Sequence, residues 1–62
     1  MKKPRFDIFA GQVYRLRNCR IKIDGVICMG GDIVELEVHS DNNVYETIGI
    51  DDFIKMDKKL IS

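Results

Sequence analysis

The basic residues of the chain are its first candidates for chemistry, because many of them fall in one short stretch. The sequence VYRLRNCRIK, at positions 13–22, contains four cations, although the formal net charge of the 62-residue chain is zero. These cations are Arg15, Arg17, Arg20 and Lys22. A ladder of positive charge on strands can contact successive phosphates of DNA or RNA. The alternative is a solvated strand face whose cations pair in part with Glu35, Glu37 or Glu46 of neighbouring strands.

A change in alternation divides this basic stretch. Apolar residues occupy even positions at 14 and 16, but odd positions from 19 to 23. A strand cannot exchange its buried face without an interruption, because its side chains alternate with a period of two. The sequence therefore predicts a bulge or a turn at Asn18, and the first two cations need not share a surface with the last two. Tyr14, the aromatic residue nearest to them, falls on the side opposite the arginines, which weakens the nucleic-acid hypothesis.

The middle of the chain carries the opposite charge. Residues 23–54 contain eight Asp or Glu residues and no Lys or Arg, whereas residues 1–22 contain seven cations and one anion. Such an acidic surface predicts a basic protein partner, for example a nucleic-acid-binding enzyme whose groove it would occupy.

Two apolar residues, Ile27 and Met29, are expected to point outward beside Arg20 and Lys22, as in an interface. A tail residue, Leu60 or Ile61, is the alternative cover for this pair. A chain of this size also gains stability from dimerisation, so a homodimer is one expected partner. The residues expected to bind a protein are Glu35, Glu37, His39, Glu46, Ile27 and Met29.

Catalysis, a metal ion and a cofactor are not expected. Cys28 and His39 are the only nucleophile–base candidates, and a thiol that faces the core is inert. Two cysteines and one histidine are too few for a structural zinc site. Cys19 and Cys28 are expected to be diagonal neighbours, about 7 Å apart, which is too far for an unstrained disulfide. With no apolar run of membrane-spanning length, we expect a non-enzymatic cytoplasmic protein that has no contact with a membrane.

β-Branched residues and turn motifs predict an all-β fold. Ile and Val number 14, against 7 for Ala, Leu and Met together. Asp24-Gly25 lies between two apolar runs and predicts a two-residue hairpin turn, and Gly30-Gly31-Asp32 predicts a second turn. The residues expected to face the core are Cys19, Ile21, Ile23, Val26, Cys28, Val34, Leu36 and Val38.

The two ends of the chain are less regular. Residues 6–9 can form a strand or one helical turn that ends at Gly11, and we favour the strand. Asp51 or Asp52 is expected to cap a single helical turn, and residues 54–56 to form the last strand. Residues 1–5 and 57–62 are expected to be frayed tails.

The run from GQVYRL through GGDIVELEV to ETIGIDDFIKM, residues 11–56, resembles SH3-like barrels. The similar features are a Gly-Asp that opens a strand, a penultimate strand that enters a one-turn helix, and a short closing strand. The resemblance implies one domain, residues 1–62, with a small five- to six-stranded barrel and one short helical turn before the last strand. The run looks like small barrel proteins of bacteriophage and mobile-element genomes, which implies a phage-type regulator or inhibitor of a host protein, or a small DNA- or RNA-binding barrel. MGGDIVELEV and NNVYETIGI are also similar to central strands of the carbon-storage regulator family, but their spacing is longer by about a residue and no C-terminal helix follows.

Overall fold

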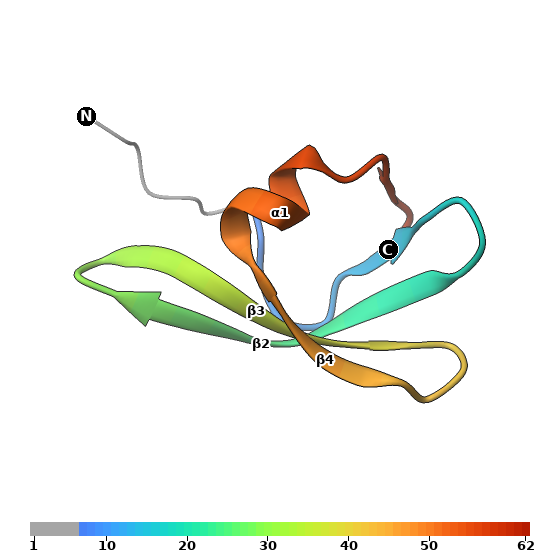
Figure 1. The fold of residues 1–62 in the computed structure, drawn as a ribbon, viewed down its shortest axis with the longest axis horizontal. Helices are drawn as coiled ribbons and strands as arrows, with labels where there is room; N and C mark the ends of the chain where they lie inside the picture. Colours follow the sequence, from blue (N-terminus) through green and yellow to red (C-terminus); the bar gives the residue numbers. More distant parts are fainter. Residues whose placement is uncertain (1–6) are drawn as a thin grey trace.

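The computed structural model describes residues 7–62, which form one antiparallel sheet of five strands and one short helix (Figure 1). The elements in chain order are β1 (Val13–Arg15), β2 (Arg20–Met29), β3 (Asp32–Ser40), β4 (Tyr45–Gly49), α1 (Ile50–Lys55) and β5 (Lys59–Leu60). The strands lie in the order β4-β3-β2-β1-β5. The predicted β fold, with a short helix before the last strand, is confirmed. The sheet formed by the described residues does not close into a barrel, so β4 and β5 are its edges.

The interruption predicted at Asn18 is a turn between two strands. The backbone N–H of Leu16 donates to the carbonyl oxygen of Cys19 at 2.7 Å, and Arg15 lies opposite Arg20 in the antiparallel ladder. Arg17 and Asn18 are therefore the two residues at the tip of a tight hairpin. The change in alternation arises here because the chain reverses direction and returns on the other strand.

The hairpin predicted at Asp24-Gly25 is wrong. β2 continues through this dipeptide, and a register shift between Ile23 and Gly25 marks a β-bulge that contains Asp24. The second predicted turn, at Gly30 and Gly31, is confirmed: their φ angles of 62° and 86° are those of a two-residue hairpin turn with both central residues left-handed. Glycine takes this conformation without a steric penalty at both positions.

The core lies on one face of the sheet. Its buried apolar side chains are Ile8, Tyr14, Ile21, Ile23, Leu36, Val38 and Phe53. Cys19, Val26 and Ile33 are half-buried and pack against this core. The prediction that Cys28 is buried is wrong. Cys28 is exposed, because it is the penultimate residue of β2 and lies close to the turn at Gly30 and Gly31. Val34, also expected inside, is half-buried at a second register shift, between Ile27 and Cys28 of the opposing strand.

The helix and the closing strand differ from the sequence prediction. The N-cap of α1 is Gly49, without a side-chain hydrogen bond, so the predicted caps Asp51 and Asp52 lie in the first turn, where their charge favours the positive end of the helix dipole. Residues 54–56 are the end of the helix and its C-cap rather than a strand. The last strand is β5, in which Lys59 and Leu60 lie opposite Arg15 and Tyr14.

Residues 57–62 are therefore not a frayed tail. The N–H of Ile61 donates to the carbonyl oxygen of Val13 at 3.0 Å, and the N–H of Val13 donates to that of Ser62 at 3.1 Å. The predicted fraying of residues 1–5, and the first residue of the strand predicted at 6–9, lie outside the described residues. Residues 7–9 form neither strand nor helix.

Gln12 anchors the segment that precedes β1 to the core. Its side-chain Oε1 accepts hydrogen bonds from the Phe9 N–H and the Tyr14 hydroxyl, both at 3.0 Å, and its Nε2 donates to the carbonyl oxygen of Asp7 at 2.8 Å. Phe53 of α1 meets the Tyr14 ring edge-on, with ring centroids 5.1 Å apart. The segment 7–12 and α1 thus cover the same, core-facing side of the sheet; α1 lies above β2 and β3 in Figure 1.

Candidate binding face of the sheet

The side of the sheet opposite the core, here called the outer face, collects most of the charged strand residues. The strand registers place their side chains there because they alternate with the buried positions. The outer face contains Val13, Arg15, Arg20, Lys22, Ile27, Met29, Asp32, Glu35, Glu37, His39, Tyr45, Thr47 and Lys59. All of these residues are exposed or half-buried. Since α1 and residues 7–12 pack on the core side, the outer face is the surface available to a partner.

Four cations gather at one end of the outer face and are here called the basic cluster. Arg15 lies opposite Arg20 on one side and opposite Lys59 on the other, so three cations form a row across β5, β1 and β2. Lys22 follows Arg20 by two residues and therefore projects from the same face. Within residues 7–62, none of the four makes an ion pair with a carboxylate. The pairing with Glu35, Glu37 or Glu46 considered from the sequence is absent.

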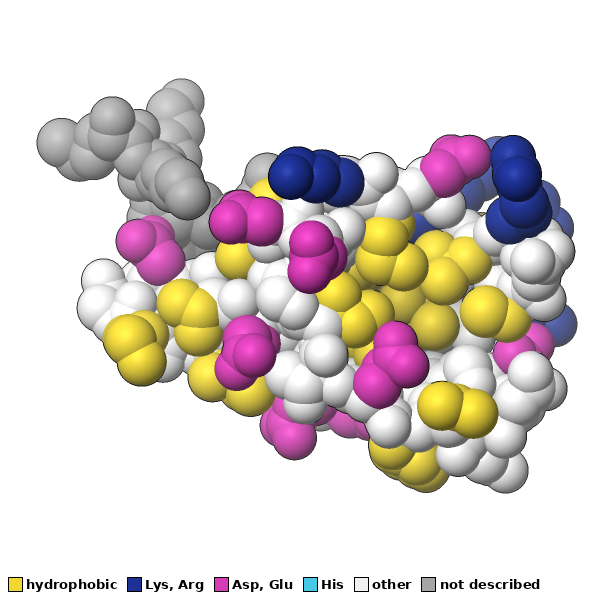
Figure 2. All heavy atoms as spheres, in the orientation of Figure 1, with side chains coloured by type: hydrophobic (Ala, Val, Ile, Leu, Met, Phe, Trp, Pro, Cys, Tyr) yellow, Lys and Arg dark blue, Asp and Glu magenta, His cyan; other side chains and the backbone are white. Residues whose placement is uncertain are grey.

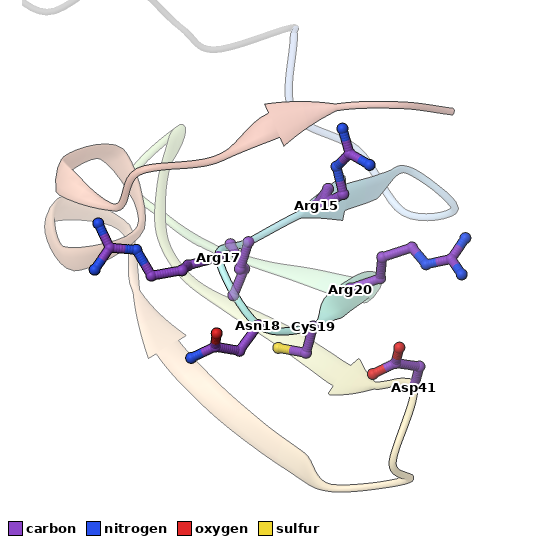
Figure 3. A pocket seen from close by; sticks show the side chains of 7 residues that line it. Arg15, Arg17, Asn18, Cys19, Arg20 and Asp41 are labelled. Carbon is purple, nitrogen blue, oxygen red and sulfur yellow. The ribbon is translucent and has the colours of Figure 1, made fainter.

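Arg17 is the member of the predicted cation set that does not join the cluster. It lies at the tip of the β1–β2 turn, and in Figure 3 its side chain points to the opposite side from those of Arg15 and Arg20. The β1–β2 turn explains why Arg20 joins Arg15 and Arg17 does not. Its tip consists of two residues, Arg17 and Asn18, so Arg20 returns to the face of Arg15 while Arg17 lies outside the ladder.

An open hollow of about 220 Å³ lies at the end of the sheet next to the basic cluster (Figure 3). It is lined by Arg15, Leu16, Arg17, Asn18, Cys19, Arg20 and Asp41. The three guanidinium groups point apart rather than toward a common centre. The arginines that line the hollow make this end of the molecule positively charged, but they do not form an enclosed pocket for a small ligand.

An aromatic pair adjoins the basic cluster on the outer face. His39 lies opposite Lys22 on one side and Tyr45 on the other, and the His39 and Tyr45 rings stack with centroids 4.9 Å apart. Nδ1 of His39 is 2.8 Å from the carboxylate of Asp24, which reaches it from the β-bulge. Tyr45 is 69% exposed, so its ring can accept a further stacking partner. The sequence did not reveal this pair, because Asp24 was assigned to a turn and the position of Tyr45 beside His39 depends on strand register.

The other end of the outer face, here called the acidic end, consists of Asp32, Glu35 and Glu37. Glu35 lies opposite Ile27, and Asp32 lies opposite Met29, which is 73% exposed. Ile27 and Met29 were expected beside Arg20 and Lys22. They lie instead at the far end of β2, among carboxylates, because β2 does not turn at Asp24-Gly25.

The positions of Glu46, Leu60 and Ile61 differ from those expected from the sequence. Glu46 lies opposite the buried Val38, so it projects on the core side of β4, where it is exposed, and does not share a face with Glu35 and Glu37. Leu60 and Ile61 lie beside β1, and they therefore do not cover Ile27 and Met29.

The cations are clustered on the surface as well as in the sequence. On the side seen in Figure 2, Lys and Arg side chains gather mainly at the end of the molecule that holds the β1–β2 turn, whereas Asp and Glu are spread along its length. In residues 7–62 no group of three or more His, Cys, Asp or Glu side chains is placed to hold a metal ion. No helix in the same part of the chain is long and apolar enough to cross a membrane.

The chain matches no protein-family model, no curated protein and no solved structure. The geometry of the outer face is therefore the basis for a functional assignment.

Proposed function

We propose that the protein is a non-enzymatic binding module of SH3-like fold that binds single-stranded nucleic acid through its outer face. The SH3-like assignment is supported by the way β4 leads directly into α1 and by the short closing strand β5, which pairs with β1. The observation that carries the binding proposal is the row of Lys59, Arg15 and Arg20, three cations side by side without a carboxylate partner in residues 7–62.

Such a row is unfavourable in isolation, because like charges directly opposite each other on neighbouring strands repel. A polyanion removes the repulsion by placing phosphates between the cations and releasing its own counterions. The row and Lys22 together offer several contacts along one backbone. This arrangement supports a nucleic-acid ligand rather than a single small anion.

The aromatic pair supports a single strand as the ligand. Proteins that bind single strands without base pairing combine a positively charged track with aromatic rings on which unpaired bases stack. Tyr45 is exposed, and it lies in one cross-strand row with His39 and Lys22. The sequence raised two objections, the division of the basic stretch and the position of Tyr14 on the opposite side. The proposal is supported against them by the registers, which place Arg15 beside Arg20 and Tyr45 in one row with His39 and Lys22.

The proposal is tested by the fluorescence anisotropy of a labelled oligothymidine of about 12 nucleotides at low salt. The variant Arg15→Glu with Arg20→Glu should weaken binding at least about tenfold, because two phosphate contacts become repulsive. Arg17→Glu is the matched control, since its charge lies outside the row. Far-UV circular dichroism verifies the fold of each variant. A wild-type protein that does not bind at low salt, or a control that weakens binding as much as the double variant, would overturn the proposal.

The acidic end favours a second candidate function, the capture of a basic protein, which was the first expectation from the sequence. The supporting observation is that exposed Met29 and half-buried Ile27 lie on one surface with Asp32 and Glu35. Apolar side chains within a charged rim are typical of protein interfaces. A role as a phage-type regulator or inhibitor of a host protein remains a prediction.

Affinity capture from a nuclease-treated lysate tests this second function. Glu35→Lys with Glu37→Lys should abolish capture of a basic protein. Glu46→Lys is the control, because Glu46 projects from the other side of the sheet. Equal capture by all three proteins would show that the acidic end is not the binding surface.

A further inference from the structure

We infer that a second copy of this chain is a partner for the acidic end, and that two copies pack outer face against outer face in antiparallel orientation. In this dimer the basic cluster of each copy meets the acidic end of the other. The inference rests on the second candidate function, the binding of a basic protein at the acidic end, and not on nucleic-acid binding.

The order of charges along the outer face carries the inference. From the β1–β2 turn toward the Gly30-Gly31 turn, β2 presents Arg20 and then Lys22, and beyond the bulge β3 presents Glu37 and then Glu35. The order is thus two positive positions followed by two negative ones. When this face is rotated by 180°, the order is reversed, and every positive position meets a negative one.

A twofold axis is the symmetry of most protein dimers, and it requires a surface that is complementary to itself. Here the axis would pass between the Lys22 and Glu37 positions. Lys22 would meet Glu37 of the second copy, and Arg20 would meet Glu35. Since each contact occurs twice, the four charged positions of one copy are all neutralised by the other.

The residues in the middle of the outer face are compatible with close packing of two copies. Gly25 has no side chain, and it lies opposite Glu37 in the ladder. The carboxylate of Asp24 and Nδ1 of His39 are directed toward each other, 2.8 Å apart, rather than toward a partner. Twisted sheets pack face to face when their strands cross at about 30°. The exposed apolar side chain of Met29 and the half-buried one of Ile27 supply apolar area at the acidic end.

The net charge of the chain is zero, so no overall repulsion opposes association of two copies. The absence of ion pairs for the basic cluster within residues 7–62 leaves its charges available to the second copy. The dimer would use the same cations as a nucleic acid, and the two partners would therefore exclude each other.

Charge exchange tests the dimer directly. The first variant, Arg20→Glu with Lys22→Glu, makes all four of these positions negative, and the second, Glu35→Lys with Glu37→Lys, makes all four positive. Analytical ultracentrifugation in the millimolar range should show a wild-type dimer that dissociates at high salt. Each variant alone should associate at least about tenfold more weakly than the wild type, because like charges meet across the axis.

An equal mixture of the two variants should form a dimer with one copy of each, which native mass spectrometry identifies by mass. The mixture restores every opposite-charge contact, so misfolding of one variant cannot imitate this result. A monomeric wild type and a monomeric mixture would overturn the inference. A dimer that persists in both single variants would overturn it too, and would indicate pairing through the free edges β4 or β5. Nucleic-acid binding by the monomer would be unaffected by either outcome, so the two proposals fail independently.

Discussion

Arg15 on β1 lies directly opposite Arg20 on β2, and its other neighbour in the sheet is Lys59 on β5. Three strands therefore bring three cations into one row on a surface that no described helix or loop covers. Neighbouring side chains of like charge are ordinarily avoided across strands, because they destabilise the sheet. A row of this kind links stability to function, since the repulsion within it is relieved by an anionic partner.

Removal of one charge from this row should stabilise the free protein. We expect Arg15→Gln to raise the free energy of unfolding by about 0.2–0.5 kcal/mol at low salt, because it relieves repulsion from both neighbours. The gain should disappear at high salt, where the repulsion is screened. Urea unfolding at two salt concentrations measures both effects. The control Arg17→Gln lies outside the row and should change stability equally at both salt concentrations; a destabilised Arg15→Gln at low salt would contradict the prediction.

Lys59 should contribute to nucleic-acid binding as much as a residue of the central strands. For single strands, each phosphate contact contributes about 0.7 to the slope of log affinity against log salt. We expect Lys59→Gln to reduce this slope by about 0.7, and Lys55→Gln, which removes an exposed cation of α1, to leave it unchanged. Anisotropy titrations over a series of salt concentrations provide the slopes. Equal slopes for the wild type and Lys59→Gln would show that β5 does not take part in the site.

Alternation in the sequence was sufficient to predict most of the core and part of the site. Ile21, Ile23, Leu36 and Val38 are buried as predicted, and the interruption at Asn18 is present. These features depend on local pattern, because one face of a half-buried strand must be apolar. The four cations of residues 13–22 were candidates for the same reason.

The features that the sequence did not predict depend on pairing between distant segments. The partner of β1 at the sheet edge is β5, and no local pattern near Lys59 reveals that pairing. The position of Tyr45 beside His39 and Lys22 requires the registers of three strands. The sequence thus identified Arg15, Arg20 and Lys22 as candidates, whereas Lys59 and Tyr45 joined the site only through strand pairing.

The sequence predicted a turn at each of two motifs, and only one of them reverses the chain between β2 and β3. Asp24-Gly25 and Gly30-Gly31 both suit a two-residue turn. A reversal at Gly30-Gly31 allows eight cross-strand pairs to form between β2 and β3. A reversal at Asp24-Gly25 would have divided β2 and limited the ladder to a few pairs on each side. Long-range pairing therefore determined which motif became the turn.

Substitution by alanine should destabilise the protein more at Gly31, which lies in the turn, than at Gly25, which lies in the continuous strand β2. Gly31 has a φ of 86°, so Gly31→Ala should cost about 1–2 kcal/mol of unfolding free energy. Gly25 has no left-handed φ, and an added Cβ would lie 3.1 Å from Oε1 of Glu37, the mobile end of a side chain. Gly25→Ala should therefore change stability by less than about 0.5 kcal/mol. Chemical unfolding of both variants measures the two losses of stability. A larger loss of unfolding free energy for Gly25→Ala than for Gly31→Ala would contradict the assignment of Gly25 to a bulge.

Tyr14 should make the fold sensitive to alkaline pH. Burial of its phenol raises the pKa above the ordinary value of 10.0, and the negative charge of Asp7 raises it further. The neutral hydroxyl donates a hydrogen bond to Oε1 of Gln12 at 3.0 Å, a bond that the ionised phenolate could not donate. In the unfolded chain the phenol loses its proton first, at about pH 10. Deprotonation therefore favours unfolding, and the stability present below pH 10 is lost as the pH rises through the folded pKa.

Urea unfolding between about pH 9 and pH 11 measures this dependence. Tyr14→Phe should be less stable than the wild type at neutral pH, by about 0.5–1.5 kcal/mol, because it leaves Oε1 of Gln12 with one fewer donor. Its stability should nevertheless fall less over the alkaline range, since the buried titrating group is gone. Tyr45→Phe removes the exposed tyrosine and should retain the wild-type decline. If Tyr14→Phe loses as much stability as the wild type on alkalinisation, the decline arises from other groups and not from the buried phenol.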